Sequence, residues 1–252
     1  MILLLIFLFG LCMGSFLHAL ADRLVKEEPF VNERSHCDHC NKTLQWYELV
    51  PLFSFLSQKG KCRHCHTQLT YYYPVTEVGT GILFTLLFIL FPLLPTFIFL
   101  LLIASLLLCI AIADAKYGLI PFPLVILGVV ITLIYFVFFH QEYLLLFFIT
   151  GIVTSLGFFL IFAVTKGKGM GFGDVVYAFL MGFLLGFPGV LIGLYMAVLT
   201  GAGVSSILIL LKKKKLRGDT IAFGPFLVLG TIITLLWSSE ILSFISRYIL
   251  YG

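Results

Sequence analysis

Hydrophobic residues occur along this chain in long runs that short polar segments separate. A run of about 20 apolar residues is long enough to cross the hydrocarbon core of a membrane as a helix. We identify eight such runs, at 1–20, 74–92, 95–113, 121–139, 143–164, 173–188, 189–211 and 221–246. The pattern therefore predicts an all-α polytopic membrane protein with about eight transmembrane helices.

The sixth and the last runs differ from the others at their ends. The sixth is short, and only Phe187, Pro188 and Gly189 join it to the seventh, which predicts a tight helical hairpin. The last run could end near Trp237, and residues 238–252 would then lie at the membrane interface.

Residues 21–73 form the one sizeable polar block of the sequence. The other segments between apolar runs are too short to fold as domains. We therefore expect three parts: a first transmembrane helix at 1–20, a small cytoplasmic insert at 21–73, and a membrane-embedded domain of about seven helices at 74–252.

The composition excludes two other classes of protein. Hydrophobic residues make up 61% of the chain, charged residues only 11%, and the mean hydropathy is +1.12. Soluble domains are about 45–50% apolar and about 25% charged. A water-soluble domain of this length would leave too much apolar surface in water, and disordered chains have the opposite composition.

The first apolar run resembles a signal peptide only superficially. A cleaved signal has a basic segment before its apolar stretch and a cleavage site with small residues after it. Here the charged residues Asp22, Arg23 and Lys26 follow the apolar stretch instead. We interpret the run as a retained anchor with its N-terminus outside the cytoplasm.

The basic residues indicate which side of the membrane faces the cytoplasm. Fifteen of the 16 Lys and Arg residues fall in the segments 21–73, 114–120, 165–172 and 212–220, which lie on one side if eight spans alternate. Such loops face the cytoplasm. The Lys212–Lys215 run is interpreted as a topology anchor, and binding of anionic membrane lipid is an additional possibility. The net charge of +4 therefore indicates no nucleic-acid partner.

Four cysteines of the insert form two C-x-x-C pairs separated by 21 residues: Cys37, Cys40, Cys62 and Cys65. This spacing is typical of a structural zinc site, in which four thiolates complete a tetrahedron. A pair of disulfides or redox pairs is the alternative, which a cytoplasmic location disfavours. The neighbouring histidines, His36, His39, His64 and His66, are expected to face solvent. Cys12 and Cys109 are expected to be packing residues.

Twelve acidic residues remain to be placed. Nine are expected to be solvated, in polar loops or near the outer side: Asp22, Glu27, Glu28, Glu33, Asp38, Glu48, Glu142, Asp219 and Glu240. The other three, Glu77, Asp114 and Asp174, lie within or at the ends of apolar runs. Ionisable groups at membrane depth are costly, so these three are candidates for function.

Asp114 ends the third run and Asp174 begins the sixth, so both lie at cytoplasmic helix ends. Two carboxylates that share a site divide into one ionised and one protonated group, which is the arrangement of aspartic proteases. Glycines before Asp174 would let the backbone unwind and a substrate approach closely.

Other interpretations of these acids exist. Asp174 alone could be a helix cap, and a proton-coupled transporter with a zinc-stapled loop could also use two buried carboxylates. A zinc-binding scaffold would leave the acids unexplained. The glycine run before Asp174 does not match a phosphate-binding loop.

Several short motifs occur in a fixed order along the whole chain. They are Gly14-Ser15-Phe16-Leu17 with Arg23-Leu24, the two C-x-x-C pairs, Tyr73-Pro74-Val75-Thr76-Glu77, Asp114 with Ile120-Pro121, Gly169-Met170-Gly171-Phe172-Gly173-Asp174, and Phe223-Gly224-Pro225-Phe226. Together they resemble the bacterial type IV prepilin peptidases, the A24 class of GxGD aspartyl proteases. The chain departs from that pattern at His18, where Asn is usual, and at Val25, where Pro is common.

The resemblance implies an inner-membrane endopeptidase that removes the short leader of type IV prepilins or pseudopilins on the cytoplasmic side, in the service of pili, competence or protein secretion. It implies that Asp114 and Asp174 are the catalytic residues. Many members also methylate the new amino terminus with S-adenosylmethionine, and the resemblance associates Glu77 and the Gly14–Phe16 segment with that activity. Glu77 could equally be an acid that complements a helix dipole.

Overall fold

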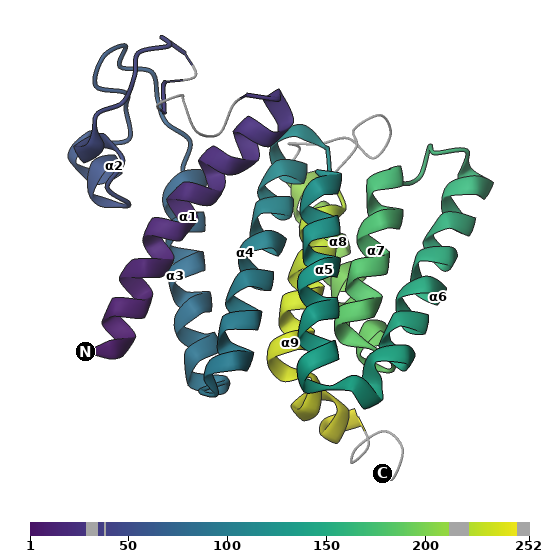
Figure 1. Cartoon of the computed structure of the whole chain (residues 1–252). Coiled ribbons are helices and arrows are strands. Elements are labelled where there is room, and N and C mark those ends of the chain that lie inside the picture. Colours follow the sequence, from purple (N-terminus) through teal and green to yellow (C-terminus); the bar gives the residue numbers. More distant parts are fainter. Residues whose placement is uncertain (29–34, 38, 212–221, 246–252) are drawn as a thin grey trace. The chain divides into compact units, whose positions relative to one another are not determined.

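The computed structural model describes residues 1–28, 35–37, 39–211 and 222–245 (Figure 1). The Lys212–Lys215 run, the basic residues Arg34, Arg217 and Arg247, and the acids Glu33, Asp38 and Asp219 lie outside these residues. The long helices are α1 (Ile2–Lys26), α3 (Tyr72–Leu90), α4 (Leu94–Tyr117), α5 (Phe122–Phe139), α6 (Gln141–Thr165), α7 (Phe172–Leu185), α8 (Gly189–Leu210) and α9 (Gly224–Ile245). The predicted all-α polytopic architecture is confirmed.

Two of these helices are short for a membrane crossing. Within the part of the chain that the structure describes, six helices are long and apolar enough to span, whereas α7 has 14 residues and the apolar part of α9 is Gly224–Ser238. At 1.5 Å per residue α7 is about 21 Å long, less than the roughly 30 Å of a hydrocarbon core. The backbone of α9 is non-helical at Trp237, where the sequence suggested that the last span could end.

The first helix is longer than its apolar run. It continues from the expected end at residue 20 to Lys26, and Glu27 closes it in a left-handed conformation with φ 57°. Arg23 and Lys26 lie in its last turn, where positive charge complements the helix dipole. Asp22 therefore lies on α1 and is half-buried, whereas the sequence analysis placed it in a solvated loop.

The chain forms two compact units, Met1–Cys109 and Ile110–Gly252, with the boundary inside α4. In the first unit, glycines bring α1 and α3 together. A Cβ on Gly10 would lie 2.7 Å from Cα of Gly81, and one on Gly14 would lie 2.8 Å from Cα of Glu77. Small residues at such seams let membrane helices approach closely.

Glycines also allow close helix packing in the second unit. A Cβ on Gly182 of α7 would lie 2.8 Å from Cα of Gly151 in α6, so only glycine permits this contact. A buried hydrogen bond of 2.9 Å between the hydroxyls of Tyr177 and Thr231 links α7 to α9. These contacts fix α7, which carries one of the candidate acids.

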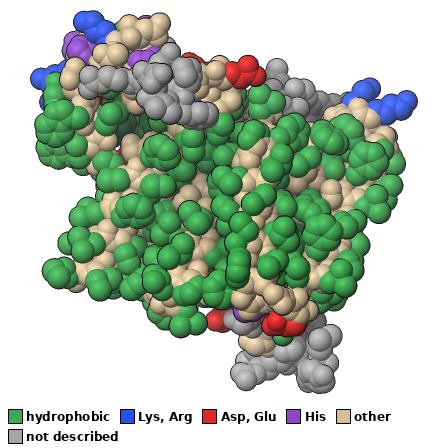
Figure 2. All heavy atoms as spheres, in the orientation of Figure 1, with side chains coloured by type: hydrophobic (Ala, Val, Ile, Leu, Met, Phe, Trp, Pro, Cys, Tyr) green, Lys and Arg blue, Asp and Glu red, His purple; other side chains and the backbone are tan. Residues whose placement is uncertain are grey.

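Hydrophobic side chains cover the visible helical faces (Figure 2). Phe138 of α5, Leu145 and Val164 of α6 are 75%, 70% and 83% exposed. Such exposure in a soluble protein would favour aggregation, whereas in lipid it is the expected surface. The chain is a multi-pass membrane protein.

Candidate functional sites

Asp114 lies in the last turn of α4. Gly118 ends this helix with a left-handed φ of 67°, and its N–H donates to the carbonyl of Asp114 at 2.8 Å. Pro121 is the N-cap of α5, so the connection between the two helices is short. The helix end therefore holds the Asp114 backbone in place.

Asp174 occupies the first turn of α7, whose N-cap is Gly171. Its Oδ2 accepts the N–H of Gly171 at 3.2 Å, so Asp174 does cap its helix. A Cβ on Gly173 would lie 3.0 Å from Cβ of Ile120. Gly173 thus serves close packing, and only Gly167 within this glycine-rich segment has a positive φ, at 75°.

Gly224, the first residue of α9, lies directly against Asp114. Its N–H donates to Oδ2 of Asp114 at 2.9 Å across 110 residues of sequence. A Cβ at this position would lie 2.5 Å from the same oxygen, so only glycine permits the approach. The sequence placed Gly224 in a motif but gave it no role.

The two carboxylates form an interacting pair within the second unit. Asp114 is 6% exposed and Asp174 is 7% exposed, and the charge of Asp114 acts on Asp174. Two buried like charges disfavour each other's ionised form. The structure therefore buries the two predicted acids within the same unit, where the charge of one acts on the other.

The four cysteines of the two C-x-x-C pairs also come together, within the first unit. Their sulfur atoms all lie within 4.8 Å of one another, and those of Cys37 and Cys65 are 3.9 Å apart. A tetrahedral zinc with Zn–S bonds of about 2.3 Å sets its sulfurs about 3.8 Å apart. The cysteines are free thiols rather than disulfides. The donor set therefore fits zinc.

The two pairs lie on equivalent turns. Cys37 donates its N–H to the carbonyl of Lys42 at 3.0 Å, and Cys62 donates to that of Thr67 at 2.9 Å. Each turn is flanked by an isolated antiparallel bridge, His36 with Thr43 and Lys61 with Gln68. Hydrogen bonding with Thr67 lowers the pKa of Cys65 to about 6, which favours the thiolate that a metal needs.

Glu77 joins α3 to the insert. Its side chain is buried, and its Oε2 accepts the N–H of Leu52 at 2.8 Å. Ser15 of α1 also hydrogen-bonds to it. Leu52 has a left-handed φ of 60°, which is costly for a non-glycine residue, so Glu77 holds a strained turn before the short helix α2 (Phe53–Ser57).

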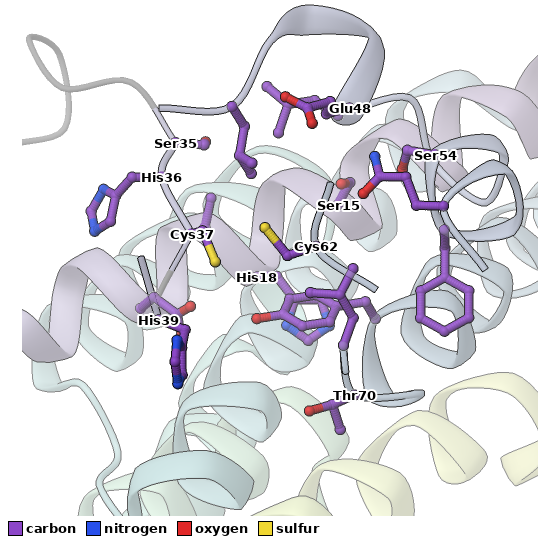
Figure 3. Close-up of a pocket in the computed structure, with 18 of the residues that line it drawn as sticks. Ser15, His18, Ser35, His36, Cys37, His39, Glu48, Ser54, Cys62 and Thr70 are labelled. Atoms are coloured by element: carbon purple, nitrogen blue, oxygen red, sulfur yellow. The ribbon is translucent and has the colours of Figure 1, made fainter. Parts of the chain in front are cut away.

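A cavity of about 450 Å³ lies in the first unit between α1, α3 and the insert. Figure 3 shows Ser15 and His18 of α1, Glu48 and Ser54 of the insert, and the sulfur of Cys62 around it. Glu77 also lines this cavity. Glu77 and two of the four cysteines, Cys37 and Cys62, therefore line the same cavity.

Glu48 corrects the sequence analysis, which expected a solvated acid. It ends the short 3₁₀ helix η1 (Trp46–Glu48) and is 7% exposed. Its Oε2 accepts the N–H of Gln45 at 2.8 Å. The Gln45-x-x-Glu48 spacing of a capping box could have revealed this local bond, but burial comes from packing of the insert.

His18, which departs from the family pattern, is 3% exposed and hydrogen-bonds through Nε2 to Oγ1 of Thr76. The Thr76 hydroxyl in turn donates to backbone carbonyls one turn earlier in α3. His18 thus ties α1 to the segment that carries Glu77.

Comparisons with known proteins match nearly the whole chain. Residues 8–91 match the family model "Bacterial Peptidase A24 N-terminal domain", and residues 100–206 match "Type IV leader peptidase family". A Prepilin leader peptidase/N-methyltransferase of Bacillus subtilis (strain 168) is 31% identical over 95% of this chain and 96% of its own length. The chain belongs to the type IV leader peptidase family.

Other members of this family give the same result. Proteins of the same name from Aeromonas hydrophila and Pseudomonas aeruginosa are 29% and 28% identical, over 94% and 93% of this chain and 91% and 90% of their own lengths. No solved structure matches the chain significantly. The family suggested by the ordered motifs is confirmed, and no comparison supports the transporter alternative.

Asp114 and Asp174 fall inside the leader peptidase match, and Glu77 and the four cysteines fall inside the amino-terminal match.

Proposed function

We propose that this chain is a membrane aspartyl endopeptidase that removes the leader of type IV prepilins or pseudopilins, with Asp114 and Asp174 as its catalytic residues. The buried, electrostatically interacting carboxylate pair carries this proposal. The backbone N–H of Gly224 donates to Oδ2 of Asp114, and that of Gly171 donates to Oδ2 of Asp174. These backbone donors hold the two carboxylates in place.

The pair performs general acid–base catalysis on the scissile peptide. The ionised carboxylate takes a proton from a water molecule while the water oxygen attacks the peptide carbonyl carbon. The protonated carboxylate gives its proton to the carbonyl oxygen. Collapse of the resulting tetrahedral diol breaks the C–N bond, and a proton passes to the departing amine. No metal is required for these steps.

The same chain is proposed to methylate the new amino terminus. S-adenosylmethionine, when bound, supplies an electrophilic methyl group for that amine. The relatives bear the name N-methyltransferase, and the cavity beside Glu77 has a polar, partly acidic lining that suits a small polar cofactor. Glu77 would act in this site as the residue that holds the cavity wall.

Zinc is proposed as a structural ion held by Cys37, Cys40, Cys62 and Cys65. When bound, it cross-links the two equivalent turns of the insert, which is too small to build a large core of its own. The sulfur cluster supports this assignment.

The cleavage site is proposed to face the cytoplasm of a bacterial inner membrane, with the N-terminus outside. The positive residues near the helix ends that carry Asp114 and Asp174, namely Lys116, Lys166 and Lys168, support this orientation.

Replacement of each aspartate tests the peptidase. Membranes that contain Asp114→Asn or Asp174→Asn are incubated with a synthetic prepilin, and mass spectrometry measures the shortened product. We expect the cleavage rate to fall by about 10²- to 10⁴-fold, since each variant removes a general acid or base.

Glu142→Gln serves as the matched control, because the Glu142 side chain is 64% exposed. It should cleave at the wild-type rate with an equal amount of protein in the membrane. Cleavage by either Asn variant at that rate would falsify the assignment.

A further inference from the structure

The cavity in the first unit has the size and shape of a small-molecule site. It measures about 450 Å³, and pockets that bind molecules of cofactor size measure about 300–1,000 Å³. Its walls come from α1, η1, α2, α3 and the two cysteine turns. This volume suits a small ligand.

The charged lining of the cavity favours a ligand that carries positive charge. Among the described residues, four acids, Asp22, Glu28, Glu48 and Glu77, line it against two bases, Arg23 and Lys26, and three histidines, His18, His36 and His39. S-adenosylmethionine carries a sulfonium and an ammonium against one carboxylate, so its charges complement this lining. Apolar and aromatic residues, Leu49, Phe55 and Tyr73, offer contacts for a planar base.

Glu48 provides the observation that points to a ligand. Its side chain is 1% exposed, and Oε2 accepts the N–H of Gln45. Its other oxygen, Oε1, is buried with no hydrogen-bond partner among the described residues. Nε2 of His64, at 4.0 Å, is too far to be a donor. A buried carboxylate oxygen without a donor is costly, unless a ligand supplies one.

We propose that this cavity is the S-adenosylmethionine site and that Oε1 of Glu48 accepts a hydrogen bond from the ribose hydroxyls or the ammonium group of the cofactor. Acidic side chains hold ribose hydroxyls in the same way in dinucleotide sites. The inference rests on the proposed methyl transfer, and it adds to that cavity a cofactor-contacting residue, Glu48, that no motif assigned.

A structural role of Glu48 makes a different prediction. If Glu48 only clamps η1 to the second cysteine turn through His64, then loss of His64 should matter as much as loss of Glu48. If Glu48 holds the cofactor, His64→Gln should bind the cofactor as the wild type does.

The test measures S-adenosylmethionine binding by the purified full-length protein with isothermal titration calorimetry. Glu48→Gln keeps the volume of the side chain and an acceptor for Gln45, and it replaces Oε1 by an amide donor. We expect Kd to rise by about 10- to 100-fold, the worth of a hydrogen bond to a charged group. Ala19→Leu, which fills the cavity from α1, should also weaken binding.

Titration of adenosine and of S-adenosylhomocysteine identifies the group that Glu48 holds. If it is the ribose, Glu48→Gln weakens both ligands; if it is the ammonium, only S-adenosylhomocysteine is weakened. Glu142→Gln is the control for both titrations, and circular dichroism and gel filtration check the fold of each variant.

The outcomes separate this inference from the function on which it rests. A wild-type protein that neither binds S-adenosylmethionine nor methylates a cleaved pilin overturns the second activity. A wild-type protein that binds the cofactor while Glu48→Gln and Ala19→Leu bind it equally well overturns the site. Equal weakening by Glu48→Gln and His64→Gln overturns the direct contact.

Discussion

At the scale of single residues, Gly224 shows how little space surrounds Asp114, one of the two proposed catalytic residues. Its backbone N–H donates to Asp114, and a Cβ would lie 2.5 Å from Oδ2 and 2.9 Å from Cγ of that residue. Gly224→Ala should push the Asp114 carboxylate out of place. We expect kcat for prepilin cleavage to fall by about 10²-fold, as for other displacements of about 1 Å at a catalytic group.

Gly203→Ala in α8 is the matched control, because a Cβ there meets no atom within 4 Å. It should leave cleavage unchanged and stabilise its helix by up to about 1 kcal/mol. Equal kcat for Gly224→Ala and Gly203→Ala would show that the glycine does not position Asp114.

The residue scale also shows which residues a sequence can single out as candidates. Asp114, Asp174 and the four cysteines could be selected because charge and thiols are conspicuous in apolar or short polar segments. Glu48 could not, since its burial depends on the packing of an insert whose fold the hydrophobic pattern does not describe. The contact between Gly224 and Asp114 spans 110 residues and leaves no periodic signal.

At the scale of elements, hydrophobic runs predicted every long helix but not every helix end. The end of α1 at Lys26 and the short α7 depend on caps, at Glu27 and Gly171, that lie outside or at the edge of the apolar runs. The hydrophobic pattern also did not predict which helices pack closely, because close packing depends on which glycines face one another across two helices.

The seam between α1 and α3 can be tested at Gly14. A Cβ there would lie 2.8 Å from Cα of Glu77 and 3.0 Å from Oγ1 of Thr80, so Gly14→Ala must separate the two helices. Overpacking of this kind costs about 1–3 kcal/mol. We expect the thermal unfolding midpoint in detergent to fall by several degrees, measured by intrinsic fluorescence.

Gly79→Ala in α3 has open space around the new methyl group, so its midpoint should equal or exceed that of the wild type. Because Glu77 lies at this seam, Gly14→Ala should weaken S-adenosylmethionine binding as well. Identical midpoints for the two alanine variants would mean that the close contact at Gly14 does not hold the helices together.

At the scale of the whole molecule, the two proposed chemistries use different compact units. Asp114, Asp174 and Gly224 all belong to Ile110–Gly252, whereas Glu48, Glu77 and the cysteines belong to Met1–Cys109. The hydrogen bonds described for each site lie within one unit. A change confined to the insert should therefore act first on methylation, while the aspartate chemistry keeps its groups.

Zinc removal tests this separation. The ion would cross-link the two cysteine turns, and Cys37 and Cys62 also line the cavity beside Glu48. Without it, the turns should open, because metal binding supplies much of the folding energy of so small an insert.

Cys62→Ser or chelation should raise hydrogen exchange in residues 35–70, while α5 to α8 keep their protection. Methyl transfer to a pre-cleaved pilin should fall at least tenfold, whereas cleavage of a prepilin should change less than threefold, as mass spectrometry can measure in one sample. Cys12→Ser, outside the cluster, should change neither rate. An immediate and complete loss of cleavage that added zinc restores would contradict this expectation, because the aspartate pair would then depend on the metal.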